Sequence, residues 1–381
     1  MHVVILNYPF DPAAPTAGAL LERYHALTGW AEAVAAAGAR VTVVQRFHRD
    51  AAPERGGVRY LLVRDGGRPV PRVWQIPRRA HRAAVAAGPD LVHLHGQIFP
   101  LQTMALRRAL GGRAALLVQH HAGDPPAPGG PRARLWRALL RAGLARADGF
   151  LFTSGELARP WREAGLIGPR QPVYPVLEAS TPLRPPDPGA PVPPLSGDPA
   201  LLWVGRLHPV KDPLTVLEGL AGALADLPGA ALSMAFGSAE LLGAVRERAA
   251  RPDLAGRVAL LGRLPPAELP AYYAAADLFV LGSRREGSGY ALIEALACGL
   301  PPAVTDIPAF RAVTGGAVGA LWPPGDAAAC AEALVRVARG DRASQRAAAR
   351  ARFAEALSWE SVGRAALGAY ADTVRRRCAS P

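Results

Sequence analysis

Short apolar runs separated by longer alanine-rich segments repeat along the first 180 residues. Each run has the length of a buried strand, and the segments between the runs have helical spacing. The predicted strands are Val3–Leu6, Val41–Val44, Val58–Val63, Leu91–Leu94, Ala115–Gln119, Phe150–Thr153 and a last one near Val173–Val176. Periodicity over Ala19–Ala37 predicts one continuous helix. Buried strands that alternate with helices need crossover connections, so this half predicts a parallel sheet covered by helices.

A proline-rich segment then interrupts the pattern. Residues 177–200 contain eight prolines and can form neither a helix nor a central strand. The alternation restarts after it, with predicted strands Leu201–Val204, Ala231–Phe236, Val258–Leu261, Leu278–Leu281 and Pro302–Thr305 and helices Pro213–Leu224, Gly289–Cys298 and Asp326–Arg339. We therefore expect a Rossmann-like domain over residues 1–180, a linker over 181–200 and a second Rossmann-like domain over 201–358. A helical tail over about 360–381 is long enough to pack on the first domain.

The predicted fold class is α/β, with two doubly wound domains that face each other across a cleft. In such sheets a ligand binds beyond the carboxyl ends of the strands. The loops that follow the predicted strands are therefore the places to look for chemistry.

Composition narrows the class of protein. Half of the residues are hydrophobic, and no stretch approaches the roughly 18 uninterrupted apolar residues of a membrane span. The first residues lack the charged and apolar regions of a secretory signal, so we expect a cytoplasmic protein, soluble or attached peripherally to the inner membrane face. The three cysteines, Cys298, Cys330 and Cys378, are far apart, which predicts buried thiols rather than disulfides or a zinc site.

The positive charge is concentrated in the first half. Of the net charge of +13, residues 1–197 carry +11 (24 basic and 13 acidic residues) and residues 198–381 carry +2 (20 and 18). A basic half fits an anionic acceptor or an anionic lipid surface, whereas arginines on solvated faces are the alternative. We expect no nucleic-acid partner, because no basic strip with interleaved aromatic residues is present.

A short loop after the predicted strand Leu201–Val204 carries two cations. It reads Gly205-Arg206-Leu207-His208-Pro209-Val210-Lys211-Asp212-Pro213, and Lys211 is the single lysine among 44 basic residues. Asp212 is placed to cap a helix that Pro213 begins. An arginine fork beside a lysine point charge suits a diphosphate and stabilises its departure without a metal ion. The alternative is a solvent-exposed charged turn.

A glycine-rich loop follows the predicted strand Leu278–Leu281. It reads Gly282-Ser283-Arg284-Arg285-Glu286-Gly287-Ser288-Gly289-Tyr290 and leads into a helix that carries Glu294. The amides that open this helix form an anion site. The spacing puts the Cα atoms of Glu286 and Glu294 about 12 Å apart, which suits an elongated ligand better than the roughly 5–9.5 Å of a glycosidase pair. The alternative is a structural turn at the start of a helix.

Together the two loops resemble the signature of family-4 retaining glycosyltransferases with the GT-B fold. The resemblance rests on Gly205-Arg206-Leu207 with Lys211-Asp212, and on Glu286-Gly287-Ser288-Gly289-Tyr290 followed by Glu294-Ala295-Leu296-Ala297-Cys298-Gly299. It is strong over residues 200–330 and diffuse before them. It implies an acceptor-binding first domain and a second domain that binds a nucleoside diphosphate sugar.

The resemblance implies a role for each matching residue of the second half. Arg206 and Lys211 would hold the donor diphosphate, and Glu294 would hydrogen-bond the ribose. Glu286, with the backbone amides that follow it, would hold hydroxyls of the donor sugar, and Arg263-Leu264 would contact the base through the backbone. The predicted donor-binding residues are Gly18, Gly205, Arg263, Leu264, Glu286, Gly287, Ser288, Gly289, Tyr290 and Glu294. The predicted catalytic residues are Arg206, Lys211, Glu286, His121 and His120. No metal ion and no cofactor besides the co-substrate would be required.

The first half carries weaker signals. The family has a glycine-rich loop after its first strand, and here Thr16-Ala17-Gly18 keeps one glycine of the usual pair. The family also places a histidine after the strand that corresponds to Ala115–Gln119, facing the donor sugar. His121 is the first choice by register and His120 the second, while His95 and Thr16 are candidates for the acceptor pocket. For each of the three histidines, a purely structural role is the alternative.

The sequence departs from the family at two places. Relatives often have an Asn-Gly-Val-Asp turn where this chain has Val176-Leu177-Glu178-Ala179, and an aromatic residue often replaces Ser288. The predicted function is a retaining transfer of a hexosyl unit from a nucleoside diphosphate sugar to an acceptor hydroxyl, the acceptor being anionic or presented at a membrane. The alternatives are a sugar-nucleotide epimerase on the same fold and a non-catalytic protein that binds nucleotide sugars.

Overall fold

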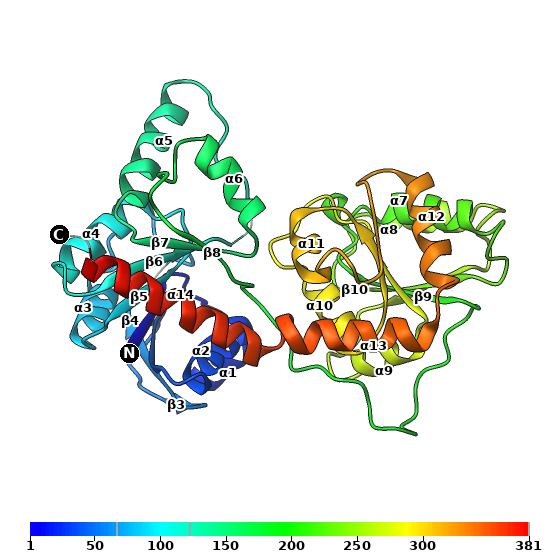
Figure 1. Cartoon of the computed structure of the whole chain (residues 1–381), viewed down its shortest axis with the longest axis horizontal. Helices are drawn as coiled ribbons and strands as arrows, with labels where there is room; N and C mark the ends of the chain where they lie inside the picture. The colour runs from blue at the N-terminus through cyan, green and yellow to red at the C-terminus, as the bar shows by residue number, and fades with distance from the viewer. Residues whose placement is uncertain (66–67, 122, 380–381) are drawn as a thin grey trace. The chain divides into compact units, whose positions relative to one another are not determined.

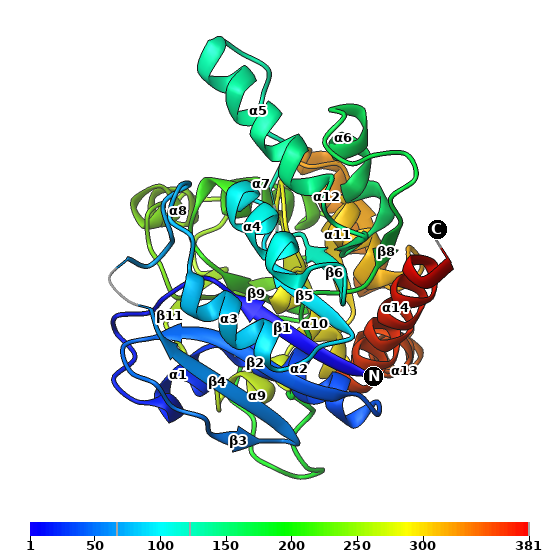
Figure 2. The same ribbon diagram turned by 90° about the vertical axis from the view of Figure 1, so that its left-hand side faces the viewer.

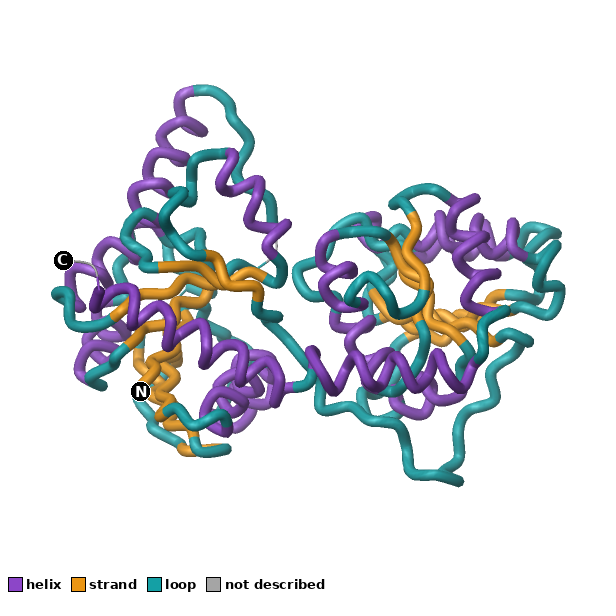
Figure 3. Tube along the Cα trace, in the orientation of Figure 1, coloured by secondary structure: helices purple, strands orange, loops and turns teal. Residues whose placement is uncertain are grey.

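The chain forms two compact units in the computed structural model, which describes residues 1–65, 68–121 and 123–379 (Figure 1). Unit 1 combines Met1–Ala179 with Trp359–Pro381, and unit 2 is Ser180–Ser358. Each unit is built around a sheet with helices on both faces (Figure 3). The last helix of the chain therefore belongs to the same unit as the first strand.

The sheet of unit 1 is parallel apart from one edge strand. Its strands are β1 (His2–Asn7), β2 (Arg40–Phe47), β3 (Glu54–Arg55), β4 (Val58–Arg64), β5 (Leu91–His95), β6 (Ala115–Gln119), β7 (Gly149–Phe152) and β8 (Val173–Pro175). They lie in the order β3-β4-β2-β1-β5-β6-β7-β8, and of these described strands only β3 runs antiparallel to its neighbour. Strands β1 and β6 are buried along their whole length, and the parallel pairing of their neighbours confirms the sheet that the apolar runs predict.

The helices of unit 1 are α1 (Ala17–Arg23), α2 (His25–Ala36), α3 (Arg78–Ala86), α4 (Pro100–Leu110), α5 (Pro131–Leu144), α6 (Gly155–Glu163) and α14 (Trp359–Ala379). The single helix predicted over Ala19–Ala37 is wrong, because the chain breaks at Tyr24, where φ is −93° and ψ is 44°. Next to this break the hydroxyl of Thr28 lies 3.3 Å from the carbonyl oxygens of Leu21, Tyr24 and His25, which share its single proton. A side-chain donor near the break compensates for interrupted helical bonding, a feature that apolar periodicity does not reveal.

Helix α14 packs against α2 and β6. Close approach is possible because Gly363 lies directly against the carbonyl of Ala33, where any Cβ atom would clash. The buried hydroxyl of Tyr370 accepts a hydrogen bond from Trp30 Nε1 at 2.9 Å and lies 2.8 Å from His93 Nδ1. Helix α14 is thus joined to helix α2 through Trp30 and to strand β5 through His93.

The sheet of unit 2 is entirely parallel within the described residues. Its strands are β9 (Ala200–Gly205), β10 (Ala231–Phe236), β11 (Val258–Gly262), β12 (Leu278–Leu281), β13 (Pro302–Thr305) and β14 (Ala320–Trp322). Its helices are α7 (Pro213–Ala223), α8 (Leu242–Ala249), α9 (Leu269–Ala275), α10 (Tyr290–Ala297), α11 (Pro308–Thr314), α12 (Ala327–Ala338) and α13 (Arg342–Arg352), with short turns at Pro209–Lys211 and Phe353–Leu357. The strand order is β11-β10-β9-β12-β13-β14, so the order reverses between β9 and β12. This reversal is where a doubly wound sheet binds ligands.

The chain between β8 and β9 contains neither helix nor strand, as its prolines predict. No described helix combines the length and the apolar character needed to cross a membrane. Cys298 and Cys330 are buried, and burial raises the pKa of each thiol to about 12. The prediction that all three thiols are buried is wrong for Cys378, because the last turn of α14 leaves this side chain exposed.

Candidate active site

The two loops singled out by the sequence follow neighbouring strands. Leu278 and Phe279 of β12 pair with Leu201 and Leu202 of β9 in parallel register. Parallel pairing brings the carboxyl ends of both strands to one edge of the sheet. The loop after β9, residues 206–212, and the loop after β12, residues 282–289, therefore lie side by side.

Direct contacts join the two loops. The backbone N–H of Arg284 donates to the carbonyl of Val210 at 2.8 Å, and the Arg284 guanidinium lies 2.7 Å from the Asp212 carboxylate. Gly282 lies so close to Asp212 that a Cβ atom would come within 2.8 Å of its carbonyl oxygen. These contacts fix the two backbones relative to each other.

The end of the first loop forms a helix cap, as predicted. Asp212 precedes α7, its carboxylate accepts from the N–H of Thr215, and Pro213 is the first residue of the helix. Asp212 has a φ of 42°, the positive value that non-glycine residues rarely adopt. The structure therefore holds Asp212 in a strained conformation at the end of the loop that carries Lys211.

Lys211 and Glu286 meet at the junction of the loops. The Nζ of Lys211 donates to Oε1 of Glu286, and the hydroxyl of Ser283 donates to the same oxygen at 2.7 Å. Only 15% of the lysine side chain and 12% of the glutamate side chain are exposed. The predicted phosphate ligand and the predicted sugar ligand thus form a nearly buried ion pair.

The other predicted donor ligands occupy the same edge of the sheet. Arg206 is exposed, and within the described part of the chain its guanidinium makes no hydrogen bond or ion pair. Arg263, also exposed, and the half-buried Leu264 follow β11. Because β11 is two strands away from β9, these residues lie about 10 Å further along the edge. The predicted donor ligands are therefore spread along the carboxyl edge of the unit 2 sheet.

Helix α10 begins beside the ion pair. Its N-cap is Gly289, with a φ of 75° and no side-chain cap, and a Cβ atom there would lie 2.6 Å from the ring of Phe310. Ser288 is buried, whereas Gly287 is half-buried and Tyr290 is exposed. Gly289 is therefore required by its backbone conformation and its packing. The start of α10 is the positive end of the helix dipole, which favours an anion there.

Glu294 lies inside α10 and has a different partner. The hydroxyl of Tyr273, on α9, donates to its Oε2 at 2.9 Å. Burial raises the pKa of Glu294, and the hydrogen bond from Tyr273 opposes that shift. Glu286 and Glu294 are thus held by separate partners, one cationic and one neutral.

The candidate histidines of unit 1 differ in accessibility. His121 has 39% of its side chain exposed, and its Nδ1 lies 2.6 Å from Oε2 of Glu178, which is 14% exposed. His120 is buried, stacks on Phe152 with ring centroids 4.5 Å apart, and places its Nε2 2.9 Å from the carbonyl of Gly123. Burial lowers the pKa of His120. Of the two neighbours, His121 is therefore the one that can meet a ligand.

The remaining predicted residues of unit 1 lie at the same edge of its sheet. The rings of His95 and His121 have centroids 4.9 Å apart, and burial lowers the pKa of His95 well below its usual value. Thr16 caps α1 by accepting from the N–H of Ala19 at 3.1 Å, and Gly18 is exposed in the same helix. His95 is thus brought together with His121, whereas the hydroxyl of Thr16 already serves as a helix cap.

Two family models match separate parts of the chain. The model described as Glycosyltransferase Family 4 matches residues 26–174, and the model described as Glycosyl transferases group 1 matches residues 198–339. The chain belongs to the family-4 glycosyltransferases. Each unit of this glycosyltransferase thus corresponds to one of the two models.

Individual relatives agree with this assignment. A D-inositol 3-phosphate glycosyltransferase of Segniliparus rotundus is 29% identical over 186 residues, which is 47% of this chain and 41% of that relative. The match thus spans about two fifths of the curated relative. Among solved structures, sucrose-phosphate synthase of Thermosynechococcus elongatus has a TM-score of 0.70 at 22% identity, covering 100% of both chains. Anabaena HepE, in complex with UDP and glucose, has a TM-score of 0.66 at 16% identity, covering 99% of this chain and 100% of that chain. The two structures confirm the GT-B fold.

Sequence reasoning missed three side chains at the site of this glycosyltransferase. Tyr273 and Ser283 contact the two glutamates, and Glu178 contacts His121. Ser283 lies in the loop that the motif already marks. Glu178 lies where the chain departs from the usual family turn, so that departure is the signal for it. Nothing in the sequence around Tyr273 indicates its partner.

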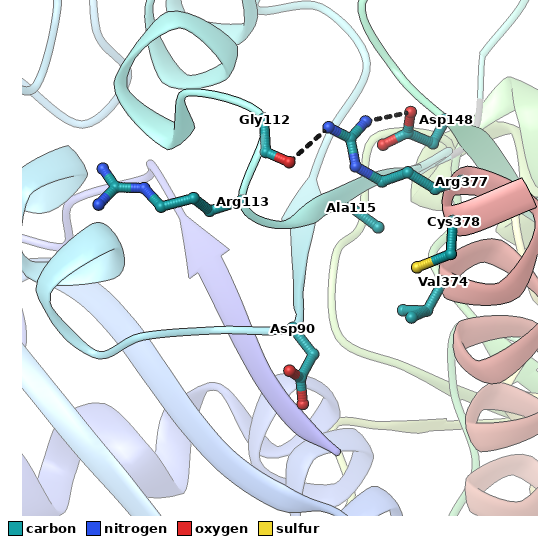
Figure 4. Close-up of a pocket in the computed structure, with 8 residues that line it drawn as sticks. All are labelled: Asp90, Gly112, Arg113, Ala115, Asp148, Val374, Arg377 and Cys378. Atoms are coloured by element: carbon teal, nitrogen blue, oxygen red, sulfur yellow. Dashed lines mark hydrogen bonds and ion pairs between the residues drawn. The ribbon is translucent and has the colours of Figure 1, made fainter. Parts of the chain in front are cut away.

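A hollow elsewhere in unit 1 of the glycosyltransferase is unrelated to these residues. Asp90, Ala115 and Asp148 lie at the amino ends of β5, β6 and β7 and line it together with Arg377 of α14 (Figure 4). Ligands of doubly wound sheets bind at the opposite, carboxyl ends. Asp148 pairs with Arg107 of α4 at 2.5 Å and with Arg377 of α14 at 3.0 Å, so its charge is used to attach these two helices. Among the described residues, no three His, Cys, Asp or Glu side chains are grouped as metal ligands.

Proposed function

We propose that this glycosyltransferase moves a hexosyl unit from a nucleoside diphosphate sugar to an acceptor hydroxyl, with retention of the anomeric configuration and without a metal ion. One observation carries the proposal. Arg206, Lys211 and the start of α10 are brought to one edge of the unit 2 sheet, at the point where the strand order reverses. Two cations and a helix N-terminus at such a point suit the charge of a diphosphate.

Each donor group has a proposed partner. Arg206 and Lys211 hold the diphosphate and stabilise the charge that develops as it leaves. Glu294 accepts from the ribose hydroxyls. Glu286 accepts from sugar hydroxyls, so donor binding replaces its bond to Lys211 with bonds to the sugar.

The proposed reaction needs no base from the protein. When the acceptor attacks on the face that the diphosphate leaves, the departing phosphate oxygen takes the acceptor proton. His121, oriented by Glu178, then contacts the donor sugar. The acceptor occupies unit 1 near His95, at the carboxyl edge of its sheet.

The test uses uridine diphosphate glucose first, because Anabaena HepE was solved with UDP and glucose. Product formation is followed by NMR with a panel of acceptors, comparing the wild type with Arg206→Ala and Lys211→Met. Arg246→Ala, which removes an exposed arginine from α8 in the same unit, is the matched control. We expect transfer to fall at least about a hundredfold in each active-site variant and to stay unchanged in the control.

The same assay separates the alternatives. An inverted anomeric centre, or near-normal transfer by the double variant Arg206→Ala/Lys211→Met, contradicts the proposal. Incubation with donor alone identifies an epimerase if the sugar nucleotide changes configuration. Binding of the nucleotide without turnover on any acceptor identifies a non-catalytic protein.

A further inference from the structure

An exposed apolar turn lies between β4 and α3 in unit 1. Trp74 is 69% exposed, and Val70 and Val73 are 50% and 36% exposed. The turn lies after the carboxyl end of β4 and before α3, the two elements labelled in Figure 2. A tryptophan with more than two thirds of its surface in water has an unfavourable hydration cost unless something covers it.

The backbone of this turn is held by a buried side chain of helix α4. The side-chain nitrogen Nε2 of the fully buried Gln102 lies 2.9, 3.1 and 3.0 Å from the carbonyl oxygens of Arg72, Val73 and Gln75, which share its two N–H donors. The backbone N–H of Gln75 also donates to the Arg72 carbonyl at 2.9 Å. The backbone on both sides of Trp74 is therefore anchored to a buried side chain.

Positive charge surrounds the apolar residues. Residues 68–82 contain five arginines, all exposed, and no acidic residue: Arg68, Arg72, Arg78, Arg79 and Arg82. Arg72 lies over the Trp74 ring, 5.5 Å from its centroid, and Arg79 pairs with Asp50. Within the described residues the other three make no ion pair. Most of this charge is therefore free to meet an external anion.

Helix α3 directs its arginines outward. Its inner face is Ala80, His81 and Ala84, and the ring of His81 lies 2.7 Å from the buried Tyr8 hydroxyl. Burial lowers the pKa of His81 to about 4, so this contact is uncharged at neutral pH. With that face fixed against β1, Arg78 and Arg82 must lie on the side of the helix that faces solvent.

We propose that the Trp74 surface, formed by Val70, Val73 and Trp74 with the arginines of residues 68–82, docks this enzyme on an anionic lipid bilayer. Arginines attract the lipid phosphates, and the tryptophan ring enters the interfacial layer, where one end is apolar and the other is wet. A nucleic acid would use the arginines but would not need the two exposed valines. The surface lies at the carboxyl edge of the unit 1 sheet, so docking brings the proposed acceptor region close to the membrane. That consequence rests on the proposed function, whereas docking itself does not.

The test is flotation of the full chain with vesicles, in the absence of donor. Phosphatidylcholine vesicles are compared with vesicles that also contain phosphatidylglycerol, each at low and high salt. We expect binding to the anionic vesicles only, and weaker binding at high salt, because surface charges are screened. Each arginine near the bilayer contributes roughly a factor of five, so Arg78→Gln/Arg82→Gln is expected to bind about 25-fold more weakly.

Matched controls identify the surface. Trp74→Ala is expected to lose most of the binding, whereas Leu135→Ala, which removes a 64% exposed leucine from the arginine-rich helix α5, keeps it. Arg108→Gln/Arg170→Gln removes the same charge from exposed positions elsewhere in unit 1 and is also expected to bind normally. All these side chains are exposed, so circular dichroism should show unchanged folding.

Several results would overturn the proposal. These are an absence of flotation with anionic vesicles, equal binding to neutral vesicles, loss of binding in Leu135→Ala instead of Trp74→Ala, and retained binding in Trp74→Ala with displacement by RNA. Isothermal titration with UDP, carried out without vesicles, tests the donor site separately. Unchanged UDP binding in Trp74→Ala shows that a flotation defect does not come from that site.

Discussion

The Lys211–Glu286 ion pair predicts that the two residues act in opposite directions on nucleotide binding. In the free protein Lys211 already donates to a carboxylate, so a diphosphate must displace Glu286 from it. Replacing Glu286 with glutamine removes this competing charge. We therefore expect Glu286→Gln to bind UDP more tightly, although Glu286 itself belongs to the proposed site.

The magnitude follows from the burial of the pair. Lys211 and Glu286 are only 15% and 12% exposed, so the pair is stronger than a surface ion pair, for which about 0–1 kcal/mol is usual. We take about 1–2 kcal/mol for the competition, which corresponds to roughly 5- to 30-fold tighter binding of UDP by Glu286→Gln. Lys211→Met removes a charged hydrogen bond to the phosphate worth about 1.5–3 kcal/mol, so it should bind roughly 10- to 150-fold more weakly.

Isothermal titration with UDP measures both effects, because UDP lacks the sugar that Glu286 is proposed to hold. The double variant completes a thermodynamic cycle, in which Glu286→Gln should help less once Lys211 is absent. Glu247→Gln, at an exposed position on α8, controls for the change in net charge. If Glu286→Gln binds UDP no better than this control, or binds it more weakly, Glu286 does not compete for Lys211 and the reasoning is refuted.

Three further predictions concern the partners that only the structure reveals. Tyr273→Phe removes a hydrogen bond that lowers the pKa of Glu294, so the rise of UDP affinity with pH should move to higher pH in titrations. The free energy of unfolding should fall as the pH rises through the same window, because the pKa of Glu294 is higher in the folded protein than in the unfolded chain. Asp148→Asn weakens the attachment of α14 and should lower the free energy of unfolding by about 1–3 kcal/mol in thermal melts, with faster proteolysis of the C-terminus. Glu178→Gln should slow transfer while leaving UDP affinity unchanged; equal loss of both would contradict its role in orienting His121.

The fold was largely predictable, because short stretches of sequence determine where its strands, helices and linker lie. The apolar runs of β1, β6 and β12 are buried strands, and the proline-rich segment before β9 contains no regular structure. The break at Tyr24 was not predictable, since the apolar periodicity continues through it and the Thr28 hydroxyl beside it leaves no signal in that periodicity. The exposure of Cys378 depends on how far α14 extends beyond its contacts, which apolar spacing does not determine.

The site was predictable as far as backbone topology determines it. Strand order places the ends of β9 and β12 together, so the meeting of Lys211 with the loop of Glu286 follows from the alternation of strands and helices. Side-chain pairing across long sequence separations did not follow. Tyr273 and Glu294 are 21 residues apart, and His121 and Glu178 are 57 residues apart.

The contacts that shape the donor site are separate from those that would bind the donor. The Arg284–Val210 backbone hydrogen bond and the packing of Gly282 against Asp212 join the loops, and neither uses a proposed ligand of the diphosphate. The backbone geometry is therefore in place before any donor arrives, which reduces the conformational entropy that binding must overcome. Lys211 is likewise already paired, so binding exchanges a carboxylate for a phosphate and does not strip water from an isolated cation. If donor binding is such an exchange, the Glu286 carboxylate becomes free only once a diphosphate has taken its lysine, and the order of events at the site follows: diphosphate first, sugar hydroxyls second.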